Sequence, residues 1–171
     1  MFQIAMSKFI SLADKISTDQ VECLNEDAEH PARNIFTSDP ARYLQSDVDP
    51  QLLVSVPFQV PVKIGSIKIS FREGIDEKSI PSSVKLFTNR VSLGFGDAEA
   101  LVPIQTIGKD ALRSGNEIPL RYVLFQNVQS IQLFFEDNGG AETTEIGEVE
   151  FFGIEAEKMD MKDFKKINDD E

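Results

Sequence analysis

LLVSVPFQVPVKIGSIKISF, residues 52–71, predicts the fold class of this chain more clearly than any other segment. Its apolar side chains recur at alternate positions, which is the period of a β-strand with one buried face. The pattern predicts one strand over Leu52–Phe58 and another over Val62–Phe71, with a turn signal at Pro61. The first hypothesis is therefore a structure built from short strands.

A glycine interrupts the second of these strand patterns. The alternation slips between Ile64 and Ile67, beside Gly65. A glycine inside a strand often marks a bulge, where one extra residue restores the buried face. We therefore expect a β-bulge at Gly65.

Further short strands follow the same pattern and are separated by turn signals. Strands are predicted over Ser83–Thr88, Arg121–Gln126, Ser130–Glu136 and Glu148–Ile154. Turns are predicted at Glu73–Gly74, Gly94–Gly96 and Asn138–Gly140. Several short strands joined by glycine- and proline-bearing loops indicate an all-β sandwich or barrel.

Helical patterns are scarce. Ser7–Asp14 is predicted to form two helical turns and Asp160–Lys166 a further short turn. The segment Asn25–Asp49 has few apolar residues, and we expect an ordered but irregular excursion there. Loops of that length in a compact domain are commonly functional.

The chain has 13 phenylalanines and no tryptophan. Two doublets, Phe134-Phe135 and Phe151-Phe152, lie in predicted strands, where neighbouring side chains point to opposite faces. One ring of each doublet is therefore expected outside the main core or under a covering loop. Sugar-binding sandwiches usually present exposed aromatic platforms, so the absence of tryptophan lowers that expectation.

Length and cysteine content limit the class of protein. A chain of 171 residues is expected to form one domain with a sizeable core. Its single cysteine excludes an internal disulfide and a CxxC redox centre. No apolar run approaches the length of a membrane helix, and Met1–Leu12 lacks the basic leader of a signal peptide. An intracellular globular domain is expected.

The charge is acidic and unevenly distributed. The formal net charge is −12, and residues 136–171 hold thirteen acidic against four basic side chains. A nucleic-acid-binding protein needs a basic stripe, which this sequence lacks, and anionic membranes are disfavoured for the same reason. The acidic ends serve solubility or, alternatively, face a basic or metal-bearing protein partner.

A search for catalytic chemistry finds no motif. His30 is the only histidine and precedes a proline in a loop, where a structural hydrogen-bonding role is favoured over a catalytic one. Cys23, between apolar neighbours, is interpreted as a packing residue. We predict no metal site and no cofactor. The carboxylates that could surround calcium are interpreted as solvated loop residues, namely Asp47, Asp49, Asp137, Glu142 and Glu145.

Four long blocks of sequence carry a resemblance to a known family. They are VECLNEDAEHPARN at Val21–Asn34, LQSDVDPQLLVSVPFQVPVKIGSIKI at Leu44–Ile69, LRYVLFQNVQSIQLFF at Leu120–Phe135 and ETTEIGEVEFFG at Glu142–Gly153. In this order they resemble the PITH domain, the C-terminal proteasome-interacting domain of the thioredoxin-like protein 1 family. The resemblance covers residues 13–167, which leaves residues 1–12 as an extension and 168–171 as a frayed acidic tail.

The resemblance implies a jelly-roll-type β-sandwich similar to galactose-binding-like domains, with short peripheral helical turns. It also implies docking on the regulatory particle of the proteasome, in the cytoplasm and nucleus. Full-length relatives carry a thioredoxin domain with the redox cysteines, and no WCxxC motif occurs in this sequence. The hypothesis is therefore a monomeric, non-catalytic adaptor. A small-ligand or carbohydrate-binding module is the alternative, and an enzyme with a carboxylate site is a weaker one.

Two groups of residues are candidates for contact with the partner. The first is the polar loop cluster of Asn25, His30, Asn34, Asp47 and Asp49, and the second is the pair Arg121 and Tyr122. An alternative role for Asn25 and Asp47 is to pin the long loop through bonds from side chain to backbone. Cross-strand pairing is the alternative for Arg121 and Tyr122. The acidic C-terminal tail from Asp160 is expected to steer the chain toward basic surfaces.

Overall fold

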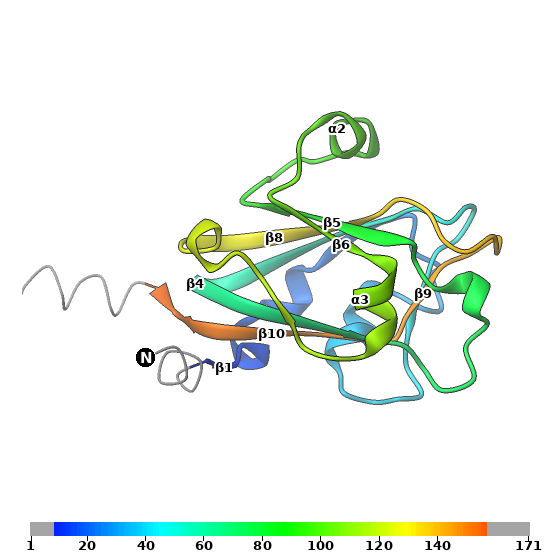
Figure 1. The fold of residues 1–171 in the computed structure, drawn as a ribbon, viewed down its shortest axis with the longest axis horizontal. Helices are drawn as coiled ribbons and strands as arrows, with labels where there is room; N and C mark the ends of the chain where they lie inside the picture. The colour runs from blue at the N-terminus through cyan, green and yellow to red at the C-terminus, as the bar shows by residue number, and fades with distance from the viewer. Residues whose placement is uncertain (1–8, 157–171) are drawn as a thin grey trace, which may run out of the picture.

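Strand β4, Leu52–Ser70, belongs to both layers of a β-sandwich in the computed structural model, which describes residues 9–156 (Figure 1). Its first half, residues 52–57, pairs with β2 (Glu22–Leu24) and β8 (Val128–Phe135). Its second half, residues 62–70, pairs with β10 (Glu148–Glu155) and β7 (Ile118–Pro119). One strand therefore connects the two sides of the core.

The turn predicted at Pro61 does not form. Residues 52–70 are a single 19-residue strand, and only the pairing register shifts between Pro57 and Val62. Proline has no N–H to donate to a neighbouring strand, so pairing with β8 lapses there. The strand bends at this point and its second half runs back in the opposite direction (Figure 1). Strands commonly change layer at such irregular points of a sandwich.

All strands of the sandwich join one antiparallel hydrogen-bonded sheet that folds into two layers. One layer contains β2, β4, β8, β5 (Ser83–Thr88) and β6 (Gln105–Gly108). The other contains β1 (Ile10–Ser11), β10, β4 and β7. A separate two-stranded sheet joins β3 (Leu44–Gln45) to β9 (Glu145–Ile146). The predicted all-β sandwich is confirmed.

Within residues 9–156 the helices are short and peripheral, as expected. Two α-helices, α2 at Phe95–Ala100 and α3 at Lys109–Ser114, flank β6. Short 3-10 helices occupy Ala13–Lys15 (η1), Thr18–Gln20 (η2), Ala32–Phe36 (η3), Glu77–Ser79 (η4) and Tyr122–Leu124 (η5). None of the helices within residues 9–156 is long and apolar enough to cross a bilayer.

Two further predicted elements are wrong, and a third, which lies partly outside the described residues, is wrong in its described part. Arg121–Gln126 alternates like a strand but forms η5, because it closes a local bond from the Leu124 N–H to the Arg121 carbonyl. The turn predicted at Gly94–Gly96 instead begins helix α2. The helix predicted over Ser7–Asp14 is replaced in its described part by β1 and η1, because pairing with β10 overrides the weak local preference.

The helical turn and the frayed tail predicted beyond residue 156 lie outside the described residues. The ordered excursion predicted over Asn25–Asp49 is confirmed, since it contains η3 and β3.

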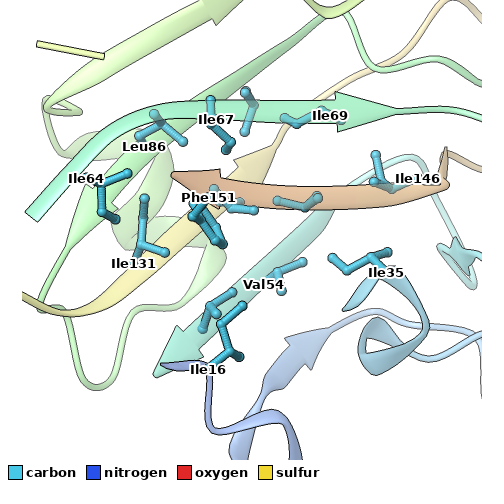
Figure 2. Packing of buried hydrophobic residues seen from close by; sticks show 14 of the residues in the cluster. Ile16, Ile35, Val54, Ile64, Ile67, Ile69, Leu86, Ile131, Ile146 and Phe151 are labelled. Atoms are coloured by element: carbon cyan, nitrogen blue, oxygen red, sulfur yellow. The ribbon is translucent and has the colours of Figure 1, made fainter. Parts of the chain in front are cut away.

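The main core lies between the two layers. Figure 2 shows Ile67 and Ile69 from the second half of β4, Val54 from its first half and Phe151 of β10 around one apolar interior. Phe135 belongs to this core, whereas Phe134 lies in a second buried cluster with Phe87 and Ala98 of α2, and Phe152 is only half-buried. The prediction that each phenylalanine doublet divides between two environments is confirmed.

The bulge predicted at Gly65 is confirmed. In the ladder between β4 and β10, Phe152 pairs with Ser66 and Gly153 pairs with Ile64, so Gly65 is the extra residue. The two strands approach closely here, because a Cβ on Gly153 would overlap the Lys63 carbonyl oxygen. The approach requires glycine at position 153.

We expect Gly153→Ala to lower the free energy of unfolding by about 3 kcal/mol, because the added methyl group forces backbone atoms apart. Urea denaturation measures the change. Gly96→Ala is the matched control, since a Cβ at this position in α2 meets open space. The control is expected to stabilise the chain by about 0.5 kcal/mol. Equal stability of the two variants would contradict the close approach.

Candidate functional site

The long excursion over residues 25–49 lies at one end of the sandwich, beside β9 and the loop before it (Figure 1). The pairing of β3 with β9 holds its C-terminal part against residues 145–146. A second tie joins Ser46 and Thr144, whose backbone N–H groups each bond to the opposite residue. These contacts attach the excursion, and with it the polar loop cluster predicted from the sequence, to the sandwich in a defined position.

Asn25 holds the two ends of the excursion together. Its Nδ2 donates to the Gln51 carbonyl at 2.7 Å and to Asp49 Oδ1 at 2.8 Å, while its Oδ1 accepts the Val48 N–H. Its φ of 72° is left-handed, a region in which asparagine is tolerated better than most residues. The Asp47 N–H also donates to the Asn25 carbonyl. Asn25 thus has the pinning role considered as the alternative.

Asn34 and His30 shape the middle of the excursion. Asn34 Nδ2 donates to the Tyr43 carbonyl at 3.0 Å. The His30 ring stacks on the Tyr43 ring, with centroids 4.2 Å apart, and its Nε2 lies 3.4 Å from the Tyr43 hydroxyl. The predicted structural role of His30 is consistent with these contacts.

Arg72 and Glu145 extend this stack from another part of the chain. The Arg72 guanidinium lies 4.7 Å from the centre of the Tyr43 ring. Its Nε and Nη2 donate to the two carboxylate oxygens of Glu145 at 3.0 and 2.9 Å. This hydrogen bonding raises the pKa of Arg72, and the Glu145 side chain is 11% exposed. His30, Tyr43, Arg72 and Glu145 thus form a continuous column.

Sequence reasoning missed Tyr43 and Arg72, and it interpreted Glu145 as a solvated loop residue. The ion pair makes that interpretation wrong, because Glu145 is buried against Arg72. The partners are 73 positions apart, so no local spacing reveals the pair. A lone tyrosine in a polar loop and an arginine directly after a strand were the available signals.

Three neighbouring side chains of the excursion face outward. Asp47 and Asp49 are exposed, and Val48 between them is 79% exposed. We call His30, Tyr43, Asp47, Val48 and Asp49 the loop platform. It joins an exposed apolar side chain, two carboxylates and an aromatic stack on one hydrogen-bonded framework.

Arg121 and Tyr122 do not join the loop platform. They belong to η5 and its N-cap. The segment between β7 and β8 that contains η5 lies at the opposite end of the sandwich from β9 (Figure 1). The Tyr122 ring packs against Phe9 with centroids 5.2 Å apart, and the Arg121 N–H donates to Gln105 Oε1. The two groups of candidate residues are therefore separate surfaces.

Cys23 lies on β2 and packs against the main core, as predicted. Burial, with a smaller contribution from Glu26, raises the pKa of its thiol. A raised pKa reduces the thiolate fraction and with it the reactivity of the sulfur.

One group of side chains within residues 9–156 has the spacing of metal ligands. Donor atoms of Asp27, Glu29 and His30 lie within 4.8 Å of one another. Exposed carboxylates commonly gather in this way without an ion, and the nearby Tyr43 hydroxyl already contacts the His30 ring. The prediction of no metal site remains a prediction.

A family model described as the PITH domain matches residues 3–169. The chain belongs to the PITH domain family. This finding confirms the resemblance carried by the four sequence blocks.

Curated relatives agree with the family. The PITH chain is 40% identical over 150 residues to Thioredoxin-like protein 1 of Schizosaccharomyces pombe, which covers 85% of this chain and 51% of the relative. It is 31% identical over 138 residues to human PITH domain-containing protein 1, which covers 77% of this chain and 64% of the relative. The chain thus spans about half to two thirds of the length of these relatives.

Solved structures show the same fold with little sequence similarity. The CBM32-1 and CBM32-2 domains of ZmpB from Clostridium perfringens, in complex with GalNAc, align with a TM-score of 0.66 at 11% identity, over 89% of this chain and 38% of that one. CpGH89CBM32-5 of the same organism aligns with a TM-score of 0.62 at 12% identity, over 84% of this chain and 100% of that one. These likenesses establish the galactose-binding-like sandwich and no more.

We expect Asn25→Ala to lower the free energy of unfolding by about 2 kcal/mol, because several hydrogen bonds and a tolerated left-handed backbone are lost together. Asn34→Ala is the control that removes the bond to the Tyr43 carbonyl, and it should cost about 1 kcal/mol. Urea denaturation compares the two variants. Equal losses would contradict the pinning role of Asn25.

The pair of Arg72 and Glu145 allows a double-mutant test. Arg72→Met is expected to cost about 2 kcal/mol, because it leaves the Glu145 carboxylate largely buried and unpaired. Adding Glu145→Leu should return stability to within about 1 kcal/mol of the wild type. Thermal and urea unfolding of the four proteins completes the cycle. An additive loss in the double variant would show that the pair is not coupled.

Proposed function

We propose that this PITH domain is a non-catalytic adaptor that binds the regulatory particle of the proteasome through the loop platform. Family membership supports the proposal, because the PITH resemblance implies that partner. The observation that carries the choice of surface is the fixed framework beneath the loop platform. Hydrogen bonds donated by the side chains of Asn25, Asn34 and Arg72 hold this framework in place.

Rigidity of the loop platform favours binding to another protein. A surface that is already ordered loses little conformational entropy when a partner docks, so more of the contact energy appears as affinity. Twenty-five residues of irregular chain would otherwise be costly to order. The bonds of Asn25 to both Asp49 and Gln51 fix that segment in advance.

The chemistry of the loop platform also resembles that of a protein interface. Aromatic and arginine side chains are enriched at such interfaces, with an apolar centre and a polar rim. Here Val48 supplies an exposed apolar contact, and Asp47 and Asp49 flank it with negative charge. A partner with a small apolar recess bordered by basic side chains fits this arrangement.

The proposed adaptor acts by attachment. In a protein that also carries a thioredoxin domain, docking of the PITH domain would raise the local concentration of that redox domain near its clients. The single cysteine of this chain is half-buried and its thiol pKa is raised, so it is poorly suited to thiol–disulfide exchange. The proposal includes a monomeric chain in the cytoplasm and nucleus.

A carbohydrate-binding function is the alternative that the fold suggests. It rests on solved structures that are 11% and 12% identical to this chain, and a shared fold does not transfer a binding site. The loop platform of this chain supports the protein-binding proposal more directly.

Co-sedimentation tests the proposal. The chain should migrate with proteasomes that carry the regulatory particle and not with the core particle alone, and added salt should weaken retention. Val48→Glu should weaken retention about tenfold by placing a charge in the apolar contact. Val102→Glu is the matched control, because Val102 is 88% exposed and lies outside the loop platform. The control should bind within about twofold of wild type.

Two outcomes would contradict the proposal. Absence of co-migration would show that the family resemblance gives the fold and not this partner. Equal weakening by the two valine variants would move the contact away from the loop platform. A rise in melting temperature with N-acetylgalactosamine would instead support the carbohydrate alternative.

A further inference from the structure

The outward face of the layer that contains β2, β4 and β8 is divided into a covered half and an open half. Cross-strand pairing aligns Leu53 with Phe134 on this face. Helix α2 covers these two side chains, with Ala98 fully buried and the Phe95 ring 6.1 Å from that of Phe134. Figure 1 shows α2 standing over this layer on the excursion between β5 and β6. The covered half is therefore a closed apolar cluster.

The open half has a polar floor. Cross-strand pairs place Ser55 beside Gln132 and Pro57 beside Ser130. The Gln132 side chain is 1% exposed, and its Nε2 donates to Ser55 Oγ at 3.1 Å and Ser130 Oγ at 2.9 Å. Its Oε1 accepts the Arg90 N–H at 3.1 Å. These bonds satisfy the donor and acceptor groups of the Gln132 side chain, and they hold the Arg90–Leu93 loop over the sheet.

Two walls enclose this floor. One wall consists of η2 and β2, from which Asp19, Glu22 and Leu24 border the space. The other wall is the Arg90–Leu93 loop. A hollow of about 600 Å³ adjoins another of about 170 Å³, and both are lined by Glu22, Ser55, Arg90 and Val91. We call this continuous space the sheet trough.

The shape of the sheet trough suits a length of extended chain. Its first wall follows the backbone from Asp19 to Leu24, so an occupant lies along β2. On β2, Glu22 and Leu24 share the outward face because side chains alternate, whereas Cys23 packs into the core. An occupant with the same two-residue period would meet an acidic and an apolar side chain in turn.

The charges of the sheet trough specify the occupant further. The first wall carries the exposed carboxylates of Asp19 and Glu22, and the second wall carries the exposed cation Arg90. The ion pairs found within residues 9–156 involve other acidic side chains than Asp19 and Glu22. An occupant lying along β2 therefore meets negative charge on that side. Leu24 is 43% exposed and Val91 is 90% exposed, so each wall also has an apolar contact. Basic side chains would complement the carboxylates, and apolar ones would cover the leucine and valine.

We propose that the sheet trough binds an extended segment of a protein partner in which basic and apolar side chains alternate. The inference deepens the proposed adaptor function and rests on it, since the occupant is taken to be part of a protein. The sheet trough and the loop platform share no residue, so the partner would contact two separate surfaces.

Titration with synthetic peptides tests the binding. The probe is a short acetylated peptide of alternating valine and lysine, and the matched control peptide alternates valine and glutamate. Nitrogen-15 NMR of the chain should show shifts in the amides of Glu22, Leu24 and Val91 with the lysine peptide. The glutamate peptide should bind at least about tenfold more weakly.

Charge reversal locates the site. Asp19→Lys with Glu22→Lys should weaken binding of the lysine peptide about tenfold. Glu73→Lys with Glu142→Lys makes the same charge change at exposed positions outside the sheet trough, so it should bind within about twofold of wild type. Equal effects of the two double variants, or shifts confined to other residues, would overturn the proposal.

Co-sedimentation separates this inference from the proposed function. If wild type and Asp19→Lys/Glu22→Lys are retained equally by the regulatory particle, the sheet trough proposal fails and the adaptor proposal stands. If wild type is not retained while the lysine peptide binds as expected, the adaptor proposal fails and the peptide site stands. Loss of retention in the double variant alone supports both.

Discussion

The crossing of β4 from one layer to the other is the constraint on which both candidate surfaces depend. The strand leaves one end of the sandwich, changes layer between Pro57 and Val62, and returns to the same end. Its first residue therefore follows the Gln51 carbonyl that Asn25 holds, and its last residue precedes Arg72 by two positions. The loop platform is assembled because both ends of one strand meet there. The same first half of β4 supplies Ser55 to the floor of the sheet trough.

Close packing stabilises the core of this domain, whereas polar side-chain networks hold its surface loops. The approach of Gly153 to the Lys63 carbonyl brings β10 against the second half of β4 and closes the apolar core. Outside the core, Asn25 and Gln132 each use a side-chain amide to fix backbone that would otherwise be loose. Surface loops fixed in this way present their exposed side chains in one arrangement. That property suits a binding module, which must recognise a partner without forming or breaking covalent bonds.

Much of the fold could be predicted because its signals are local. Alternation located most strands, a slip in alternation located the bulge at Gly65, and the phenylalanine doublets indicated that one ring of each pair lies outside the main core. The failures have physical reasons. Residues 121–126 alternate like a strand, yet a tight local hydrogen bond makes them helical, and they leave Val123 79% exposed. Proline at position 61 indicated a turn because sequence alone does not show that the chain changes layer there.

The candidate sites were less predictable, because their contacts join distant positions. The sequence grouped Asn25 and Asn34 in one loop cluster, but their roles as pins became visible only with their backbone partners. The coupling of Arg72 to Glu145 spans 73 positions. The sheet trough depends on the Arg90–Leu93 loop being held by Gln132, which no spacing in the sequence indicates.

Amide hydrogen exchange, compared between the free chain and the chain bound to the regulatory particle, tests whether the loop platform and the sheet trough bind one partner. We expect slower exchange in the bound state at residues 22–24, 45–49 and 90–93, with little change around residues 121–125. Slowing confined to residues 121–125, or spread evenly over the chain, would contradict it.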